Sequence, residues 1–117
     1  MSDSLSKALA NTRAYQQQRP AIVIAGVQAL DRLIRIAQGD TGQSQVVGGF
    51  LLSLYNGDDY RFDLTALRTL DALIFEDCIS VLLMDYQPEV EEHERIPGGN
   101  VIWKGLIKRW APKAVTP

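Results

Sequence analysis

The densest group of potentially reactive side chains lies in residues 89–94. This segment holds the only histidine, His93, beside Glu89, Glu91, Glu92 and Glu94. Glu89 and His93 have the i,i+4 spacing at which two helical side chains can share a metal ion, and a histidine near carboxylates can act as a base. One histidine without further strong ligands, however, does not make a familiar zinc site. We therefore interpret residues 89–94 as a solvated acidic loop, with no metal ligand and no catalytic residue.

Two further reactive side chains, Asp77 and Cys78, stand next to each other in an apolar segment. Because Cys78 is the only cysteine, an internal disulfide is excluded, and its apolar neighbours predict a small buried side chain. Asp77 lies on an apolar arc, where an unpaired charge is costly. A structural partner is the preferred explanation, and the candidates are Arg35, Arg61 and Arg68. The alternative is a carboxylate left free for an arginine of another protein.

No pattern of an enzyme or of a cofactor site emerges elsewhere. The Gly-Gly pairs at 48–49 and 98–99 match no phosphate-binding loop, and no serine stands in a nucleophile-elbow motif. We expect no enzymatic activity and no cofactor. The net charge of −2 gives no global reason to expect nucleic acid, and neither a membrane-spanning run nor a signal peptide is recognisable, so we expect a cytoplasmic protein.

The candidate binding surface is a helix expected over residues 101–110. Its apolar side chains fall on one face, whereas Lys104 and Lys108 fall on the opposite side and Arg109 on the flank. In the preferred interpretation the apolar face closes the core against residues 21–38, and the basic side faces outward. The alternative is an exposed face that itself binds a partner. The candidate partner-binding residues are Trp103, Lys104, Lys108, Arg109 and Trp110.

The positions of these residues depend on a helix expected over residues 63–85. Asp63 is a favourable N-cap, and the apolar side chains that follow cover most of the circumference of a helix. A helix of this kind is normally enclosed by others. The fold class is therefore all-α: a single small domain of four to five helices packed around one long central helix at about 63–85. A break near Asp71, which can cap a second helix, is the alternative.

The rest of the chain supplies the partners of that helix. Residues 1–19 read as a polar N-terminal arm or weak helix that ends before Pro20, and residues 20–117 as the helical domain. A strong helix is expected over residues 21–38, with an ion pair between Asp31 and Arg35 and a left-handed stop at Gly39. Residues 46–55 predict a short helix that stops at Gly57. A β-hairpin over Phe50 to Phe62, turning at Asn-Gly, is the competing interpretation.

Four short runs, at residues 49–57, 62–64, 75–78 and 84–86, together resemble a small family of uncharacterised proteins. These proteins are carried by conjugative and integrated elements of proteobacteria, and the similarity covers roughly residues 45 to 110. The resemblance implies an accessory protein of a mobile element and no assigned activity. We therefore expect a non-enzymatic module that binds a host or element-encoded protein, in an anti-defence or regulatory role. Nucleic-acid binding through the basic C-terminal helix is the alternative.

Overall fold

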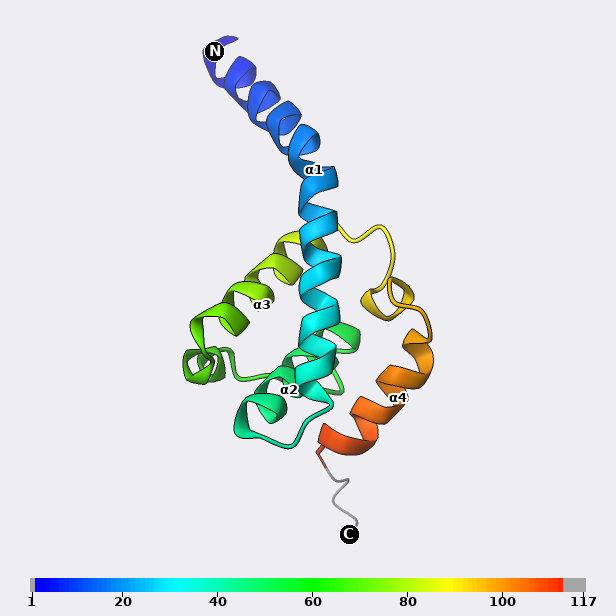
Figure 1. Ribbon diagram of the computed structural model, residues 1–117. Helices are drawn as coiled ribbons and strands as arrows, with labels where there is room; N and C mark the ends of the chain where they lie inside the picture. The colour runs from blue at the N-terminus through cyan, green and yellow to red at the C-terminus, as the bar shows by residue number, and fades with distance from the viewer. Residues whose placement is uncertain (1, 113–117) are drawn as a thin grey trace.

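The computed structural model describes residues 2–112 and contains four α-helices and two short 3₁₀-helices (Figure 1). The α-helices are α1 (Ser2–Ala37), α2 (Gly42–Tyr55), α3 (Ala72–Asp85) and α4 (Gly99–Trp110). The 3₁₀-helices are η1 (Leu64–Thr69) and η2 (Glu92–Glu94). No β-strand occurs within residues 2–112, so the all-α class is confirmed and the hairpin alternative is wrong.

The centre of the domain is the second half of α1, and not the segment 63–85. Five side chains on this half of α1 are buried: Ala29, Leu30, Leu33, Ile34 and Ala37. The most extensive helix contacts are those of α1 with α3 and of α1 with α2. Figure 1 shows α1 running between α3 on one side and α4 on the other. The expected ion pair of Asp31 and Arg35 is present at 2.8 Å.

The expected continuous helix over 63–85 is wrong, because two extended residues, Leu70 and Asp71, separate η1 from α3. Asp63 does cap the first piece by accepting the backbone N–H of Thr65 at 3.0 Å. Gln43 of α2 holds the break by donating to the Asp71 carboxylate at 3.0 Å and accepting the Asp71 N–H at 2.8 Å. A tertiary contact from a distant helix therefore replaces the local hydrogen bonds that a continuous helix would make.

A helix end was expected before Pro20, yet α1 continues through this residue. The chain there is fastened by Arg19, which donates to the carbonyl oxygens of Gln87 at 2.6 Å and Leu83 at 3.4 Å. Tyr15 adds an edge contact with the ring of Tyr86 at 6.2 Å. These contacts to the end of α3 compensate for the hydrogen bond that proline cannot donate.

The first part of α1 projects from the domain (Figure 1). Side chains 3–14 are all exposed, Leu5 at 63% and Leu9 at 50%, and the molecule measures 60 × 31 × 27 Å. A helix of this length without packing partners is marginal in water, so this arm depends on its continuity with the docked half of α1.

Two glycines expected to stop helices in the left-handed conformation do not do so. The one glycine with positive φ within residues 2–112 is Gly98, at 71°, immediately before α4. Helix α2 ends instead at Asn56, whose side chain accepts the backbone N–H groups of Asp58 and Asp59 at 3.1 Å each. The polar turn thus forms without a glycine in the left-handed region.

Candidate protein-binding groove

The acidic segment with His93 does not bring His93 and Glu89 together as a pair. The His93 ring packs between two aromatic rings, with centroids 5.3 Å from Tyr55 and 6.3 Å from Trp103. Glu89 points elsewhere and lies 3.5 Å from Arg19. Within residues 2–112, no three His, Cys, Asp or Glu side chains are grouped closely enough to hold a metal ion. His93 therefore acts as a packing residue between α2 and α4.

The expectation of a fully solvated acidic loop is wrong at Glu92, whose exposed fraction is 2%. Its carboxylate lies 3.7 Å from Nε of Arg95, which is also largely buried. Burial raises the pKa of Glu92 to about 8; nearby Asp85 and, more weakly, Glu91 add to this rise, and Arg95 opposes it. This buried contact fastens the connection from α3 to α4 inside the protein.

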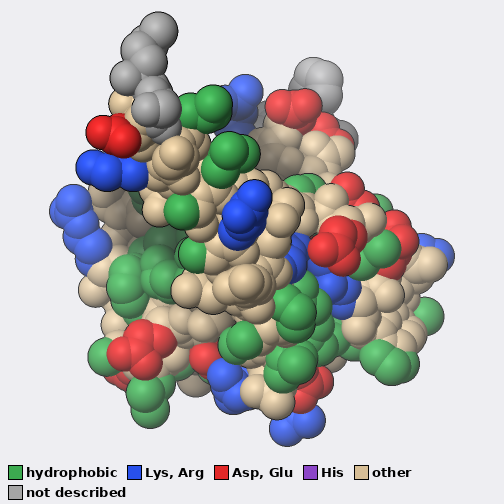
Figure 2. Space-filling model, turned by 90° about the horizontal axis from the view of Figure 1, so that it is seen from above, with side chains coloured by type: hydrophobic (Ala, Val, Ile, Leu, Met, Phe, Trp, Pro, Cys, Tyr) green, Lys and Arg blue, Asp and Glu red, His purple; other side chains and the backbone are tan. Residues whose placement is uncertain are grey.

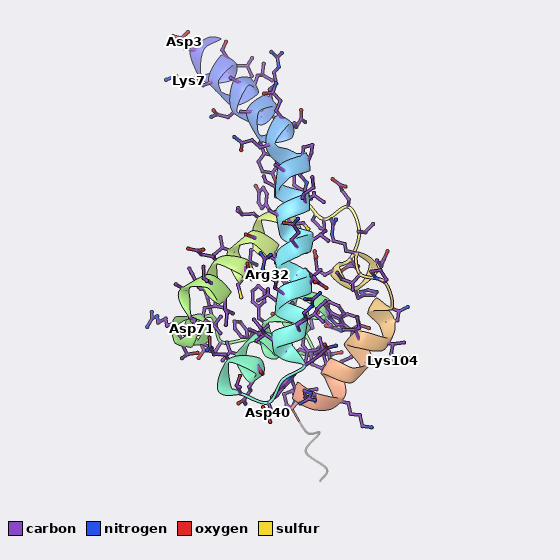
Figure 3. The ribbon with its side chains drawn as sticks, in the orientation of Figure 1. Asp3, Lys7, Arg32, Asp40, Asp71 and Lys104 are labelled. Carbon is purple, nitrogen blue, oxygen red and sulfur yellow. The ribbon has the colours of Figure 1, made fainter. Side chains whose placement is uncertain are left out.

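Asp77 and Cys78 both have structural roles. Asp77 accepts two hydrogen bonds from the guanidinium of Arg32, at 2.8 and 2.9 Å, and so joins α3 to α1. The expected structural pairing is correct, but the partner is none of the three arginines considered. Arg32 lies on α1, facing α3 (Figure 3). Cys78 is fully buried as expected, and burial, with a smaller effect of Asp77, raises the pKa of its thiol to about 12.

The structure divides the candidate partner-binding residues of α4 into two groups. Trp103 is 2% exposed, and Trp110 is partly buried and donates its indole N–H to the Ala37 carbonyl at 2.6 Å. The ring of Trp110 lies against Gly48, where a Cβ would overlap it. The absence of a side chain at Gly48 therefore allows α4 to pack closely on α2. The apolar face of α4 therefore closes the core, mainly against α2 and η2.

The basic residues of α4 remain at the surface. Lys104 and Lys108 are exposed, and Lys104 lies on the outer side of the helix (Figure 3). Arg109 is exposed as well, but its guanidinium donates to the Gly39 carbonyl at 2.9 Å and so helps to fix the end of α4.

An apolar surface that the sequence analysis did not predict lies on the outer side of α3. Besides the face that packs on α1, α3 carries a second apolar stripe at three- and four-residue spacing: Ala72, Phe75, Ile79, Leu82 and Tyr86. The exposed fractions are 40% for Phe75, 37% for Ile79 and 75% for Tyr86. Neighbouring Leu83 is 51% exposed. The sequence shows apolar residues on nearly every side of this helix, but that pattern predicts a helix enclosed by its own domain and not one with an exposed apolar face.

Helix η1 turns this stripe into one wall of a groove of about 640 Å³. The groove lies between η1 and α3, and Arg68 is the only charged residue among those of the described chain that line it. Its lining is otherwise apolar except for Thr65: Leu64, Leu67, Leu70, Ala72, Phe75, Ile79 and Leu82. Figure 2 shows hydrophobic side chains around a hollow on the side of the molecule where α3 and η1 lie in Figure 1.

A second hollow of about 370 Å³ extends this apolar surface toward α2. It shares Leu64 and Leu82 with the groove, and it contains another arginine, Arg61. Leu64, which stands between the two hollows, is 70% exposed. Large contiguous apolar patches are uncommon on monomeric proteins and typically mark binding surfaces.

The fold and the groove together define a class: a small all-helical domain that presents an apolar groove, rimmed by arginine, to the solvent. More particularly, the chain belongs to the family of unknown function DUF7673, whose model matches residues 27–111. The matched residues include both walls of the groove. No curated protein and no solved structure matches the chain significantly. Within residues 2–112, no helix is both long enough and apolar enough to cross a membrane.

Proposed function

We propose that this chain is a non-enzymatic protein-interaction module that binds its partner in the groove between η1 and α3. The observation that carries the proposal is the second apolar stripe of α3, which remains exposed although the helix is already packed on α1. Grooves of this kind accept an amphipathic helix whose apolar side chains recur at three- and four-residue spacing. Arg68 at the rim favours an acidic flank on that helix.

The biological setting belongs to the same proposal. The resemblance of residues 49–57, 62–64, 75–78 and 84–86 to proteins of conjugative and integrated elements supports an accessory role on a mobile genetic element, in the cytoplasm. The partner is then a host or element-encoded protein, and the role is anti-defence or regulatory. The setting rests on analogy, and the groove supports only the mode of binding.

The test is a pull-down from the native host with tagged wild-type protein and two matched variants. Phe75→Glu places a charge in the groove and should abolish stoichiometric capture of a protein partner. Leu73→Glu changes a leucine on the same helix that is 75% exposed and lies outside the groove, and it should leave capture unchanged. Equal capture by wild type and Phe75→Glu would exclude the groove as the binding site.

Nucleic-acid binding is the second candidate, favoured by the exposed lysines on the outer side of α4. Lys113, which would extend this basic surface, lies outside the described residues. In a mobility-shift or anisotropy assay, binding should weaken with rising salt, because phosphate contacts release counterions. The double variant Lys104→Glu, Lys108→Glu should abolish nucleic-acid binding without unfolding the domain. Phe75→Glu should leave nucleic-acid binding unchanged. Salt-insensitive binding, or binding unaffected by the double variant, would contradict this candidate.

A further inference from the structure

We infer that the occupant of the groove is a second copy of this chain, with the two α3 helices antiparallel and Ile79 on the two-fold axis. This inference rests on the proposed function, whose binding surface it shares. A two-fold interface uses the same patch on both subunits, so the patch must complement itself. The evidence lies in the order of side-chain sizes and in the distribution of charge along α3.

The exposed stripe of α3 has the spacing of a helix–helix seam. Ala72, Phe75, Ile79, Leu82 and Tyr86 follow one another at three or four residues, as the a and d positions of a coiled coil do. The inner face of α3 is separate, since Cys78, Val81 and Met84 are fully buried in the core. A partner helix can therefore pack on the outer stripe without reaching these buried residues.

An antiparallel arrangement centred on Ile79 pairs side chains of complementary size. Ala72 then lies opposite Tyr86 of the second copy, and Ile79 lies opposite its own counterpart. Phe75 lies opposite Leu83, which flanks the stripe, and Leu82 lies opposite Glu76 at the edge of the seam. The smallest residue of the stripe thus meets one of the largest, as interdigitated cores require. A parallel arrangement would instead place Tyr86 against Tyr86 and Ala72 against Ala72, crowding one end of the seam and leaving the other empty.

The charges at the two ends of α3 favour the same orientation. Exposed Arg68 and Asp71 lie at the N-terminal end of α3. Exposed Glu91 and exposed Glu89, which also pairs with Arg19, lie in the segment that follows its C-terminal end. Antiparallel packing brings the arginine end of one copy to the acidic end of the other. Parallel packing would bring the two acidic ends together, which opposes association.

The first test is the oligomeric state, measured by sedimentation equilibrium over a wide concentration range. Wild type should approach twice the monomer mass as concentration rises. Ile79→Glu should stay monomeric, because the two-fold axis places the two introduced carboxylates against each other. Leu73→Glu, on the flank of the same helix, should associate like wild type. A wild-type protein that stays monomeric throughout, or an Ile79→Glu protein that still associates, would overturn the inference.

The second test determines orientation by cross-linking single-cysteine variants with a short bismaleimide. Ile79→Cys should cross-link to itself, and a mixture of Ala72→Cys with Tyr86→Cys should give the mixed dimer. Ala72→Cys alone should not react with its own copy, from which the antiparallel register separates it by about 20 Å. The native Cys78 is buried and should not react with the cross-linker, so it need not be replaced. Self-cross-linking of Ala72→Cys would show a parallel pair and contradict the inferred arrangement.

The outcomes also separate this inference from the proposed function. If the wild type is monomeric and captures another protein, and Phe75→Glu abolishes that capture, self-association is refuted. The groove then remains a binding site for the other protein. A dimer that is unaffected by Phe75→Glu and Ile79→Glu would refute the inferred dimer, since association would then use another surface, and the pull-down alone would decide whether the groove binds another protein.

Discussion

Two glycines within helices, Gly48 in the core and Gly105 at the surface, should respond in opposite ways to substitution by alanine. A Cβ at Gly48 would overlap the ring of Trp110, whereas a Cβ at Gly105, within α4, would meet no atom within 4 Å. Gly105→Ala should therefore stabilise the protein by about 0.5–1 kcal/mol, the usual gain for this change within a helix. Gly48→Ala should destabilise it by about 1–3 kcal/mol, because the indole must move out of a well-packed site.

Urea unfolding followed by tryptophan fluorescence would measure both changes. A shift of the native emission to longer wavelength should accompany Gly48→Ala alone, since it loosens the contact of Trp110 with the Ala37 carbonyl. Stabilisation by both substitutions would mean that α4 is not held against α2 as described.

Buried Glu92 should make stability fall as pH rises. Its carboxyl has a pKa of about 8 in the folded protein, compared with its ordinary value of 4.5, so the folded state retains a proton that the unfolded state releases. Between about pH 5 and 8 the folded state therefore binds more protons, and each step toward higher pH favours unfolding. Above about pH 8 Glu92 is ionised in both states, so it no longer changes the free energy of unfolding as pH rises.

The matched variant is Glu92→Gln, which keeps the shape and removes the titration. Its free energy of unfolding should depend less on pH between 5 and 8 than that of wild type. Asp63 does not interfere, because hydrogen bonds from Thr65 lower the pKa of its carboxyl below this window. Parallel profiles of wild type and Glu92→Gln would show that Glu92 is ionised in the folded protein.

At the scale of elements, α3 is unusual in having two apolar faces with different roles. Val81 on the inner face is fully buried, whereas Leu83 on the outer face is 51% exposed. Val81→Ala should cost about 2 kcal/mol through the cavity it leaves, and Leu83→Ala should change stability by less than about 0.5 kcal/mol. Chemical denaturation at low protein concentration measures both without a contribution from association. Equal losses would mean that the outer face is also part of the core.

The same helix shows how far local sequence patterns predict this fold. The Asp63 cap, the helix after Pro20 and the inward face of α4 all follow from local rules, and the structure confirms them. The break at Asp71 was predicted only as the alternative, and the partner of Asp77 was not identified, because Gln43 and Arg32 reach these residues from other helices. Local periodicity describes a helix but does not identify its partners.

The groove was missed for a related reason. Hydrophobic periodicity shows that α3 has apolar residues on nearly every side, but it cannot distinguish a helix enclosed by its own domain from one that keeps a face for another molecule. Within residues 2–112, α1 packs on the inner side of α3, and no other helix makes comparably extensive contacts with α3. The candidate site on α4 was predicted from the helical spacing of its apolar and basic residues, yet both tryptophans there pack against the rest of the domain.

At the scale of the whole molecule, the projecting half of α1 determines the shape. The radius of gyration is 16.6 Å, compared with about 13 Å for a compact chain of this length. Deleting residues 2–14 should bring the radius close to the compact value with little loss of stability, since the side chains described there are exposed. Small-angle scattering and thermal denaturation of the Ile79→Glu variant, with and without the deletion, would test this on a monomer.

A deletion that extends through residue 22 is the contrasting case. It also removes Arg19 and its hydrogen bonds to the end of α3, so it should lower the melting temperature clearly. A large loss already with the shorter deletion would show that the arm packs on the domain more than its exposure indicates.

The complete burial of Cys78 makes this thiol a built-in reporter of how often the core opens. It lies on the face of α3 that packs on α1, and burial raises its pKa to about 12, so alkylating reagents should reach a reactive thiolate only when α3 separates from α1. The labelling rate under native conditions then measures the free energy of that opening. Because a bound second copy would hold α3 in place, labelling of wild type should slow as protein concentration rises, and labelling of Ile79→Glu should not.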